Sequence, residues 1–389
     1  MNNETRKETQ VLPKDVRYVG ADDLTLPLFE NQYPVQPMGV SYNSYLILDE
    51  KVAVMDSVDA RAADEWLAKL AHELDGRSPD YLVISHMEPD HSGSILRLAE
   101  KYQEMKLVGN TKTFTMLRQF FGAKAPTDDR LLEVGEGETL PLGAHTLHFM
   151  LAPMVHWPEV MVAYEETEKI LFSADAFGRF GALSRTAAAP WAPQARRYYY
   201  NIVGKYGAQV QALLKKASAL EIETICPLHG PVLTGGALAE ALRLYDLWSR
   251  WQSEAPEEIL LAHASIHGNT ARAAELFKQK LEAKGARVTL CDLTTTEVSY
   301  AVANAFYCGK LVLACSTYDG GLFPPMEEFL SHLQAKGFRD RSVGLMENGS
   351  WAPAAARLMR AKLEEMKDLR VCGTVVSLRS ALSPASEAQ

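Results

Sequence analysis

The side chains best suited to chemistry gather in one short string, SHMEPDHSG at residues 85–93. Within six positions it holds imidazole and carboxylate groups, at His86, Glu88, Asp90 and His91. An apolar segment typical of a strand precedes the string, and the proline inside it argues against a helix interior. We therefore expect a tight extended loop whose alternate side chains converge on one side, as metal ligands must. A solvated loop with two chance histidines explains the pattern less well.

Three further candidate ligands, His156, Asp175 and His229, are distant in sequence but share one placement. Each stands at the tip of a predicted strand beside a glycine or proline turn, in MVHWPEVM, KILFSADAFG and TICPLHGP. Alone, each would more often cap a loop or form a structural hydrogen bond. Together they are typical of a site, because strand tips at one sheet edge bring distant residues together. Inside predicted elements, and so expected not to bind metal, lie His72, His145 and His148.

The complete candidate set contains four histidines and three carboxylates, which is too many for one tetrahedral ion. It suits two metal ions with one carboxylate bridging them. Because the set contains no thiolate and is rich in carboxylates, it favours iron or manganese over zinc. The seven candidate ligands are His86, Glu88, Asp90, His91, His156, Asp175 and His229.

A second group of candidate residues follows three predicted strands near the C-terminus. The string SIHGNT at residues 265–270 joins a strand to a helix, where hydroxyls, backbone N–H groups and a helix N-terminus can hold a phosphate. Ser and Thr before a helix are also common as plain N-caps. Strings STYDGG at 316–321 and ENGSW at 347–351 end the next strands, at the sheet edge where open α/β sheets bind ligands. The candidate cofactor-binding residues are Ser265, Ile266, His267, Gly268, Asn269, Thr270, Ser316, Thr317, Tyr318, Asp319, Gly320, Gly321, Asn348, Gly349, Ser350 and Trp351.

Two regions of the chain must position these residues. The first, of about 250 residues, mixes apolar strand-like segments with helical patterns and predicts an α/β domain. A polar, proline-containing stretch at 251–258 indicates a linker. Beyond it the expected elements alternate, which predicts a doubly wound parallel sheet with a short or absent final helix. The expected strands there are 259–265, 287–293, 310–316, 342–347 and 370–378, and the helices are 271–284, 297–306, 324–336 and 352–366.

Length and composition agree with this division. The chain has 389 residues, of which 47% are apolar and 23% charged, as in globular proteins of two to three domains. Its net charge of −9 argues against a nucleic-acid partner. Neither a membrane-spanning apolar run nor a signal peptide is visible. Five cysteines without a C-x-x-C pair indicate a reducing, cytoplasmic location.

The H-x-E-x-D-H string resembles the ligand loop of the metallo-β-lactamase superfamily, whose hydrolases usually carry His where Glu88 stands. With PMVHWPE, LFSADAFG, RRYYYNI and CPLHG, the sequence resembles the flavodiiron proteins over nearly its whole length. The C-terminal loops also resemble those of flavodoxins. The resemblance implies an α/β chain: a metallo-β-lactamase-like αβ/βα sandwich at residues 1–253 and a flavodoxin-like FMN domain at 257–389.

The resemblance also implies a role for each ligand. His86, Glu88 and His156 would bind one iron, and Asp175 would bridge the pair. Asp90, His91 and His229 would bind the other iron, although in some members the equivalent of His91 does not coordinate. In the tyrosine run, Tyr198 and Tyr199 are candidate catalytic residues, because a buried tyrosine can donate a hydrogen bond or a proton to bound oxygen. Core packing is the alternative role for both.

The implied activity is that of an oxidoreductase reducing O2 to water, NO to N2O, or both, with electrons delivered through FMN. O2 reduction with NO reduction as a shared activity is the favoured version. The resemblance further implies rubredoxin or another external electron donor and a head-to-tail homodimer or tetramer. Two rival functions remain open: a dizinc hydrolase fused to a flavodoxin, and a non-enzymatic flavin electron carrier.

Overall fold

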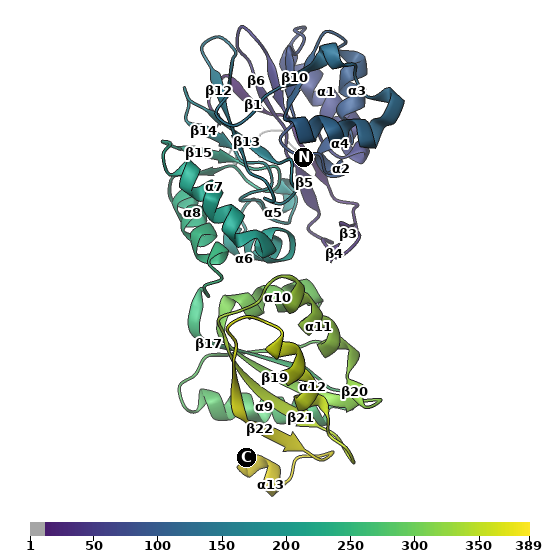
Figure 1. Ribbon diagram of the computed structural model, residues 1–389, viewed down its shortest axis with the longest axis vertical. Helices are drawn as coiled ribbons and strands as arrows, with labels where there is room; N and C mark the ends of the chain where they lie inside the picture. Colours follow the sequence, from purple (N-terminus) through teal and green to yellow (C-terminus); the bar gives the residue numbers. More distant parts are fainter. Residues whose placement is uncertain (1–11) are drawn as a thin grey trace. The chain divides into compact units, whose positions relative to one another are not determined.

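The computed structural model describes residues 12–389, which form two compact units (Figure 1). The first unit runs to Tyr199 and resumes over Ala208–Asp246. The second unit contains Tyr200–Gly207 and Leu247–Gln389. The domain boundary between residues 253 and 257 stays a prediction, and the excursion of residues 200–207 into the second unit was not anticipated.

Two mixed sheets form the first unit, in the orders β1-β6-β7-β8-β9-β10 and β11-β12-β13-β14-β15-β16. Two small pairs, β2 with β5 and β3 with β4, lie outside them. The strands are β1 (Val16–Tyr18), β2 (Ala21–Asp23), β3 (Leu28–Phe29), β4 (Tyr33–Pro34), β5 (Val40–Tyr42), β6 (Tyr45–Ile47), β7 (Ala53–Met55), β8 (Tyr81–Val83), β9 (Lys106–Gly109), β10 (Leu131–Glu133), β11 (Thr139–Pro141), β12 (Thr146–Leu151), β13 (Met161–Glu165), β14 (Ile170–Phe172), β15 (Thr224–Cys226) and β16 (Leu233–Thr234).

The core of the first unit lies between these two sheets. Tyr45, Met55 and Val83 of the first sheet share one buried cluster with Phe149 and Phe172 of the second. In Figure 1, helices flank each sheet on its outer side, which completes the predicted αβ/βα sandwich. These helices are α1 (Ala63–Leu74), α3 (Ile95–Lys101) and α4 (Thr111–Phe121) beside the first sheet, and α7 (Gly207–Ala217) and α8 (Gly235–Ser249) beside the second.

The second unit has the predicted doubly wound architecture. Its parallel strands follow the order β18-β17-β19-β21-β22, with β20 paired to β19 at one end. Helix α9 packs on one face of this sheet, and α10, α11 and α12 cover the other (Figure 1). The elements are β17 (Ala255–Ala264), α9 (Asn269–Glu282), β18 (Val288–Asp292), α10 (Val298–Tyr307), β19 (Cys308–Tyr318), β20 (Gly321–Leu322), α11 (Pro324–Ala335), β21 (Ser342–Asn348), α12 (Ala355–Glu364) and β22 (Arg370–Leu378).

The predicted linker at 251–258 is shorter than expected, because β17 already begins at Ala255. Ala255 pairs with Cys308, and an irregularity follows before pairing resumes at Ile259. A proline in this interrupted stretch does not break the ladder, since prolines are tolerated at strand starts and bulges. The polar residues that suggested a linker therefore belong to the irregular beginning of β17.

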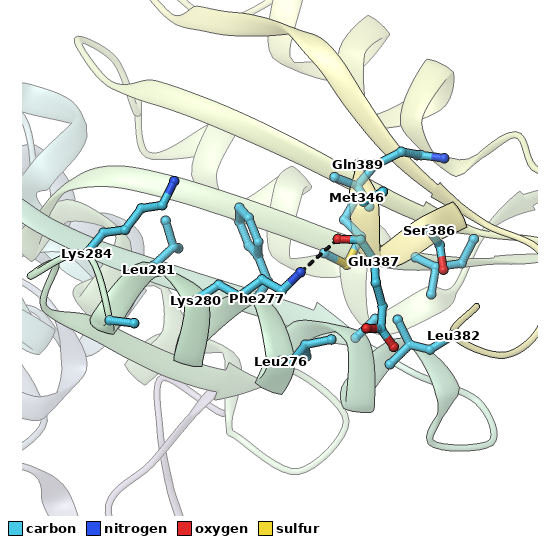
Figure 2. Close-up of a pocket in the computed structure, with 15 residues that line it drawn as sticks. Leu276, Phe277, Lys280, Leu281, Lys284, Met346, Leu382, Ser386, Glu387 and Gln389 are labelled. Carbon is cyan, nitrogen blue, oxygen red and sulfur yellow. Dashed lines mark hydrogen bonds between the residues drawn. The ribbon is translucent and has the colours of Figure 1, made fainter. Parts of the chain in front are cut away.

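The final helix is short, as the sequence predicted: α13 covers Pro384–Ala388. Between it, α9 and β22 lies a cavity of about 480 Å3 (Figure 2). Phe277 and Met346 line its apolar wall, and Lys280 Nζ donates to the backbone oxygen of Glu387 at 2.7 Å. Among residues 12–389, no helix is both long enough and apolar enough to cross a membrane.

Candidate metal centre and flavin pocket

The ligand string after β8 is not the extended loop that the sequence predicted. Glu88 is extended, with ψ of 141°, but Pro89–Ser92 form the single helical turn α2. Pro89 occupies the first helical position, where a missing N–H costs nothing and the fixed φ suits the helix. Asp90 and His91 therefore project from a helical turn, whereas His86 and Glu88 precede it.

The seven candidate ligands form two adjoining clusters. Within each cluster, one ligand atom per residue lies within 4.8 Å of every other. We call the first the His86 subsite, made of His86, Glu88 and His156, and the second the His91 subsite, made of Asp90, His91 and His229. Asp175 belongs with the first cluster but also faces the second.

Asp175 lies between the two subsites, with one oxygen toward each. Its Oδ2 is 2.9 Å from His156 Nε2 and 3.5 Å from His86 Nε2. Its Oδ1 is 3.2 Å from His91 Nε2 and 3.7 Å from His229 Nε2. A carboxylate in this position is suited to bridge two metal ions.

The imidazole nitrogens of each subsite converge. His86 Nε2 lies 3.3 Å from His156 Nε2, and His91 Nε2 lies 3.0 Å from His229 Nε2. All four rings are buried. Lone pairs that converge beside carboxylates are the arrangement that a bound cation requires, and the donor set of imidazoles and carboxylates fits iron.

The electrostatics of the cluster are those of a cation site. Burial opposes the charged form of His156, but the carboxylates of Asp175 and Glu88 outweigh it and raise the pKa to about 9. His91 behaves alike, because Asp90 and Asp175 overcome burial and raise its pKa to about 10. The histidines in turn overcome the effect of burial on Asp175 and hold its pKa well below the usual range. The cluster therefore attracts positive charge, which protons supply when no metal does.

Glu159 is a member of the site that the sequence analysis missed. Its Oε1 accepts a hydrogen bond from His86 Nδ1 at 2.8 Å and another from the Met87 backbone N–H at 2.9 Å. This contact leaves His86 Nε2 facing the cluster and fixes the orientation of the ring. The available signal was the HWPE string, where the carboxylate follows His156 by three residues.

The equivalent partner in the His91 subsite is a backbone group. His229 Nδ1 lies 2.7 Å from the carbonyl oxygen of Ser41, the middle residue of β5. For His91 Nδ1, the described residues provide no hydrogen-bond partner. A backbone carbonyl has no side-chain signature, so this contact was not readable from the sequence.

The two candidate catalytic tyrosines differ in their surroundings. Tyr198 ends α6 (Trp191–Tyr198), and its ring centroid lies 5.6 Å from that of His229. Its hydroxyl is buried without a hydrogen-bond partner among residues 12–389. Burial, followed by the negative charges of Asp175 and Asp90, raises the pKa of Tyr198 well above its usual value, so the hydroxyl keeps its proton.

Tyr199 turns away from the ligands and packs against Tyr245, with ring centroids 5.0 Å apart. A π-helical turn at Tyr199–Val203 follows α6. The next residue, Tyr200, stacks on Phe306 of the second unit at 4.0 Å. Consecutive tyrosines thus serve different neighbours, and the two hydroxyls are not equivalent.

The three histidines expected not to bind metal lie outside both clusters. Each ring is paired with a glutamate instead, at 2.8–3.2 Å. The pairs are His72 with Glu73, His145 with Glu165, and His148 with Glu166.

The three C-terminal loops of the second unit line one pocket of about 450 Å3. Of the candidate residues, Gly268 and Gly321 do not line it, and Gly268 instead precedes α9 with φ of 83°. Ala352 and Ser380, which the sequence analysis did not select, complete the wall. The lining candidates are Ser265, Ile266, His267, Asn269, Thr270, Ser316, Thr317, Tyr318, Asp319, Gly320, Asn348, Gly349, Ser350 and Trp351.

The chemistry of this pocket fits a flavin mononucleotide. At the N-terminus of α9, the buried Ser265 hydroxyl has no hydrogen-bond partner among the described residues, as expected for a phosphate ligand. Thr270 and Ser316 place their hydroxyls 2.8 Å apart beside it. At the other loops, Tyr318 and Trp351 are 44% and 87% exposed, which leaves their rings available to a flavin.

Comparisons with known proteins agree with this architecture. A family model described as ODP family beta lactamase matches residues 40–230. The rubredoxin-oxygen oxidoreductase of Megalodesulfovibrio gigas is 27% identical over 356 residues, which span 90% of this chain and 87% of that protein. A nitric oxide reductase of Moorella thermoacetica is 26% identical over 362 residues, or 90% and 88% of the two chains.

The structural likeness is equally extensive. The crystal structure of the flavodiiron protein from Giardia intestinalis matches with a TM-score of 0.89 at 26% identity, and the match covers 98% of this chain and 94% of that one. A lactamase-like fold followed by a flavodoxin-like fold defines the class. The recognition made from the sequence is confirmed: the chain resembles the flavodiiron proteins in sequence and in fold over nearly its whole length.

Proposed function

We propose that this protein reduces O2 to water, NO to N2O, or both at a diiron site, with electrons that reach the site through FMN. The observation that carries the proposal is the presence, on one chain, of a two-subsite His/carboxylate cluster and a flavin-sized pocket. Relatives named as a rubredoxin-oxygen oxidoreductase and as a nitric oxide reductase support both gases as substrates. O2 is the substrate that we favour.

The residues of the first unit have distinct proposed roles in this reaction. When bound, the irons and the flavin supply the electrons. The His86 and His91 subsites hold one ion each, and Asp175, with an oxygen toward each subsite, holds the two together. Tyr198 keeps its hydroxyl proton beside the cluster and can donate a hydrogen bond to a gas molecule there. Tyr199 remains the second candidate, although its ring packs on Tyr245.

The decisive experiment measures gas consumption by the protein after its iron and FMN contents have been determined. The protein is reduced anaerobically and then exposed to O2 or to NO. We expect consumption of at least one gas, and His86→Ala should lose iron and both activities while FMN stays bound. Gas reduction that survives in His86→Ala would contradict the site assignment. The dizinc hydrolase alternative requires bound zinc, hydrolytic turnover and no gas consumption. The alternative of a flavin electron carrier requires electron exchange with neither hydrolysis nor gas consumption.

The partners follow from the same proposal. We propose rubredoxin or a similar small redox protein as electron donor, which the name of the Megalodesulfovibrio gigas relative supports. We also propose a head-to-tail homodimer, alone or within a tetramer, in which the flavin of one subunit serves the metal site of another. Analytical ultracentrifugation with activity measured on the same sample tests this, because a fully active monomer would contradict it. A reducing, cytoplasmic location is supported by five free cysteines.

A further inference from the structure

The two subsites are matched in their direct ligands. Each contributes two imidazoles and one carboxylate of its own, and Asp175 turns one oxygen toward each. A difference in the groups behind the ligands can make their affinities for a metal unequal, beyond the exchange of Glu88 for Asp90. The structure shows such a difference.

Behind the His86 subsite stands a buried carboxylate. Glu159 is 1% exposed and accepts hydrogen bonds from His86 Nδ1 at 2.8 Å and from Met87 N at 2.9 Å. An anionic acceptor on Nδ1 makes the opposite nitrogen a stronger donor to a metal and adds negative charge near it.

Behind the His91 subsite the support is weaker. The Nδ1 of His229 has the neutral carbonyl oxygen of Ser41 as its partner, at 2.7 Å. The Nδ1 of His91 has no hydrogen-bond partner among the described residues, so no such contact fixes the orientation of its ring. With a neutral acceptor on one ring and none on the other, these imidazoles are less firmly oriented than His86.

We infer that Glu159 is a positioning residue that makes the two metal subsites unequal: the His86 subsite binds its metal first and more tightly, and the His91 subsite fills second. This inference rests on the proposed function only in taking both subsites as metal sites. The metal in the His91 subsite is therefore expected to dissociate more readily than the metal in the His86 subsite.

An anaerobic titration of the metal-free protein with Co2+, followed by visible absorption, tests the order of filling. Wild-type protein should bind two equivalents in two steps, the first at least about tenfold tighter. His229→Ala should keep the first step, and His156→Ala should lose it. The reverse pattern, or a single step for two equal sites, would overturn the inference. Circular dichroism and FMN content show whether each variant is folded.

Glu159→Gln tests the cause, because the amide can still accept from His86 but carries no charge. We expect the first step to weaken by about 10- to 100-fold, so that the two steps merge. Glu165→Gln is the matched control, since Glu165 is also buried and accepts from a histidine, His145 Nδ1 at 3.1 Å, and from the Thr167 backbone at 2.9 Å.

Unchanged steps in Glu159→Gln, or merged steps in Glu165→Gln, would contradict the role of Glu159. Gas turnover is not part of this measurement. A protein that fills in the expected order but consumes no gas contradicts the proposed function alone. A gas reductase whose two sites fill together contradicts this inference alone.

Discussion

At the scale of single residues, ligand types were predictable and their supporting contacts were not. His156, Asp175 and His229 could be selected because each was expected at the tip of a strand beside a turn. In the structure they lie in the loops after β12, β14 and β15, and the fold brings all three to the string at residues 85–93. Glu159 lies 73 residues from His86, and nothing in the local sequence states which ring it accepts from. Sequence patterns indicate where a residue lies relative to a strand. The hydrogen-bond partner of its side chain depends on how the fold packs distant segments together.

Tyr198→Phe tests whether the hydroxyl of Tyr198 takes part in the reaction. The variant keeps the ring that packs near His229 and removes a buried donor that has no partner among the described residues. If this hydroxyl donates to the substrate, steady-state gas consumption should fall by about 100-fold, while iron and FMN contents stay at wild-type levels.

Tyr199→Phe is the matched control for that measurement, because Tyr199 is equally buried but packs on Tyr245. Its activity should stay within about twofold of wild type, since the contact of its ring with Tyr245 survives the loss of the hydroxyl. An equal loss in both variants would extend the catalytic role to Tyr199, and no loss in either would remove it from Tyr198.

At the scale of elements, the regular part of the chain was predictable and the irregular part was not. The five parallel strands lie where the alternating pattern predicted them, because buried strands and amphipathic helices have different periods. The turn α2 was missed, since the same proline that excludes a helix interior favours a helix start. The early start of β17 at Ala255 was missed because a strand irregularity there admits polar residues.

Gly349→Ala tests the loop between β21 and α12 that borders the flavin pocket. A Cβ at this position would lie 2.6 Å from Pro353 Cα, so the backbone must shift, at a cost of about 1–3 kcal/mol. The shift should reach Ser350 and Trp351 and weaken FMN binding by about tenfold, as measured by fluorescence titration of the apoprotein.

Gly373→Ala on β22 serves as the control for that substitution. A Cβ there meets nothing within 4 Å, and neither glycine has a positive φ. Flavin affinity in Gly373→Ala should equal that of the wild type. Weakening of the same size in both variants would show that the effect comes from general destabilisation and not from the pocket.

At the scale of the whole molecule, length and composition predicted more than one compact unit. They could not predict which segments of the chain belong to which unit. The assignment of Tyr200–Gly207 to the second unit depends on tertiary packing alone. The stacking of Tyr200 on Phe306 is a contact between residues 106 positions apart in sequence, and the RRYYYNI string does not indicate which ring Tyr200 stacks on.

Removal of iron should destabilise the first unit and spare the second. A ligand that binds only the folded state stabilises it by about 2.7 kcal/mol at 100 times its dissociation constant. For a unit of this size that corresponds to about 5–10 °C in Tm. Differential scanning calorimetry of iron-loaded and chelator-treated protein, with FMN retained, should show one transition moving and the other fixed. A common shift of both transitions would mean that the units unfold together.

The path of the backbone has a consequence for how such a protein can be divided or recombined. The chain passes between the two compact units after Tyr199, after Gly207 and again after Asp246. No single cut separates the units, and a fragment that starts at residue 257 lacks the aromatic ring that stacks on Phe306. Truncation at one joint therefore leaves residues 200–207 with the first unit. An isolated flavin fragment should be engineered with residues 200–207 supplied in trans or grafted back.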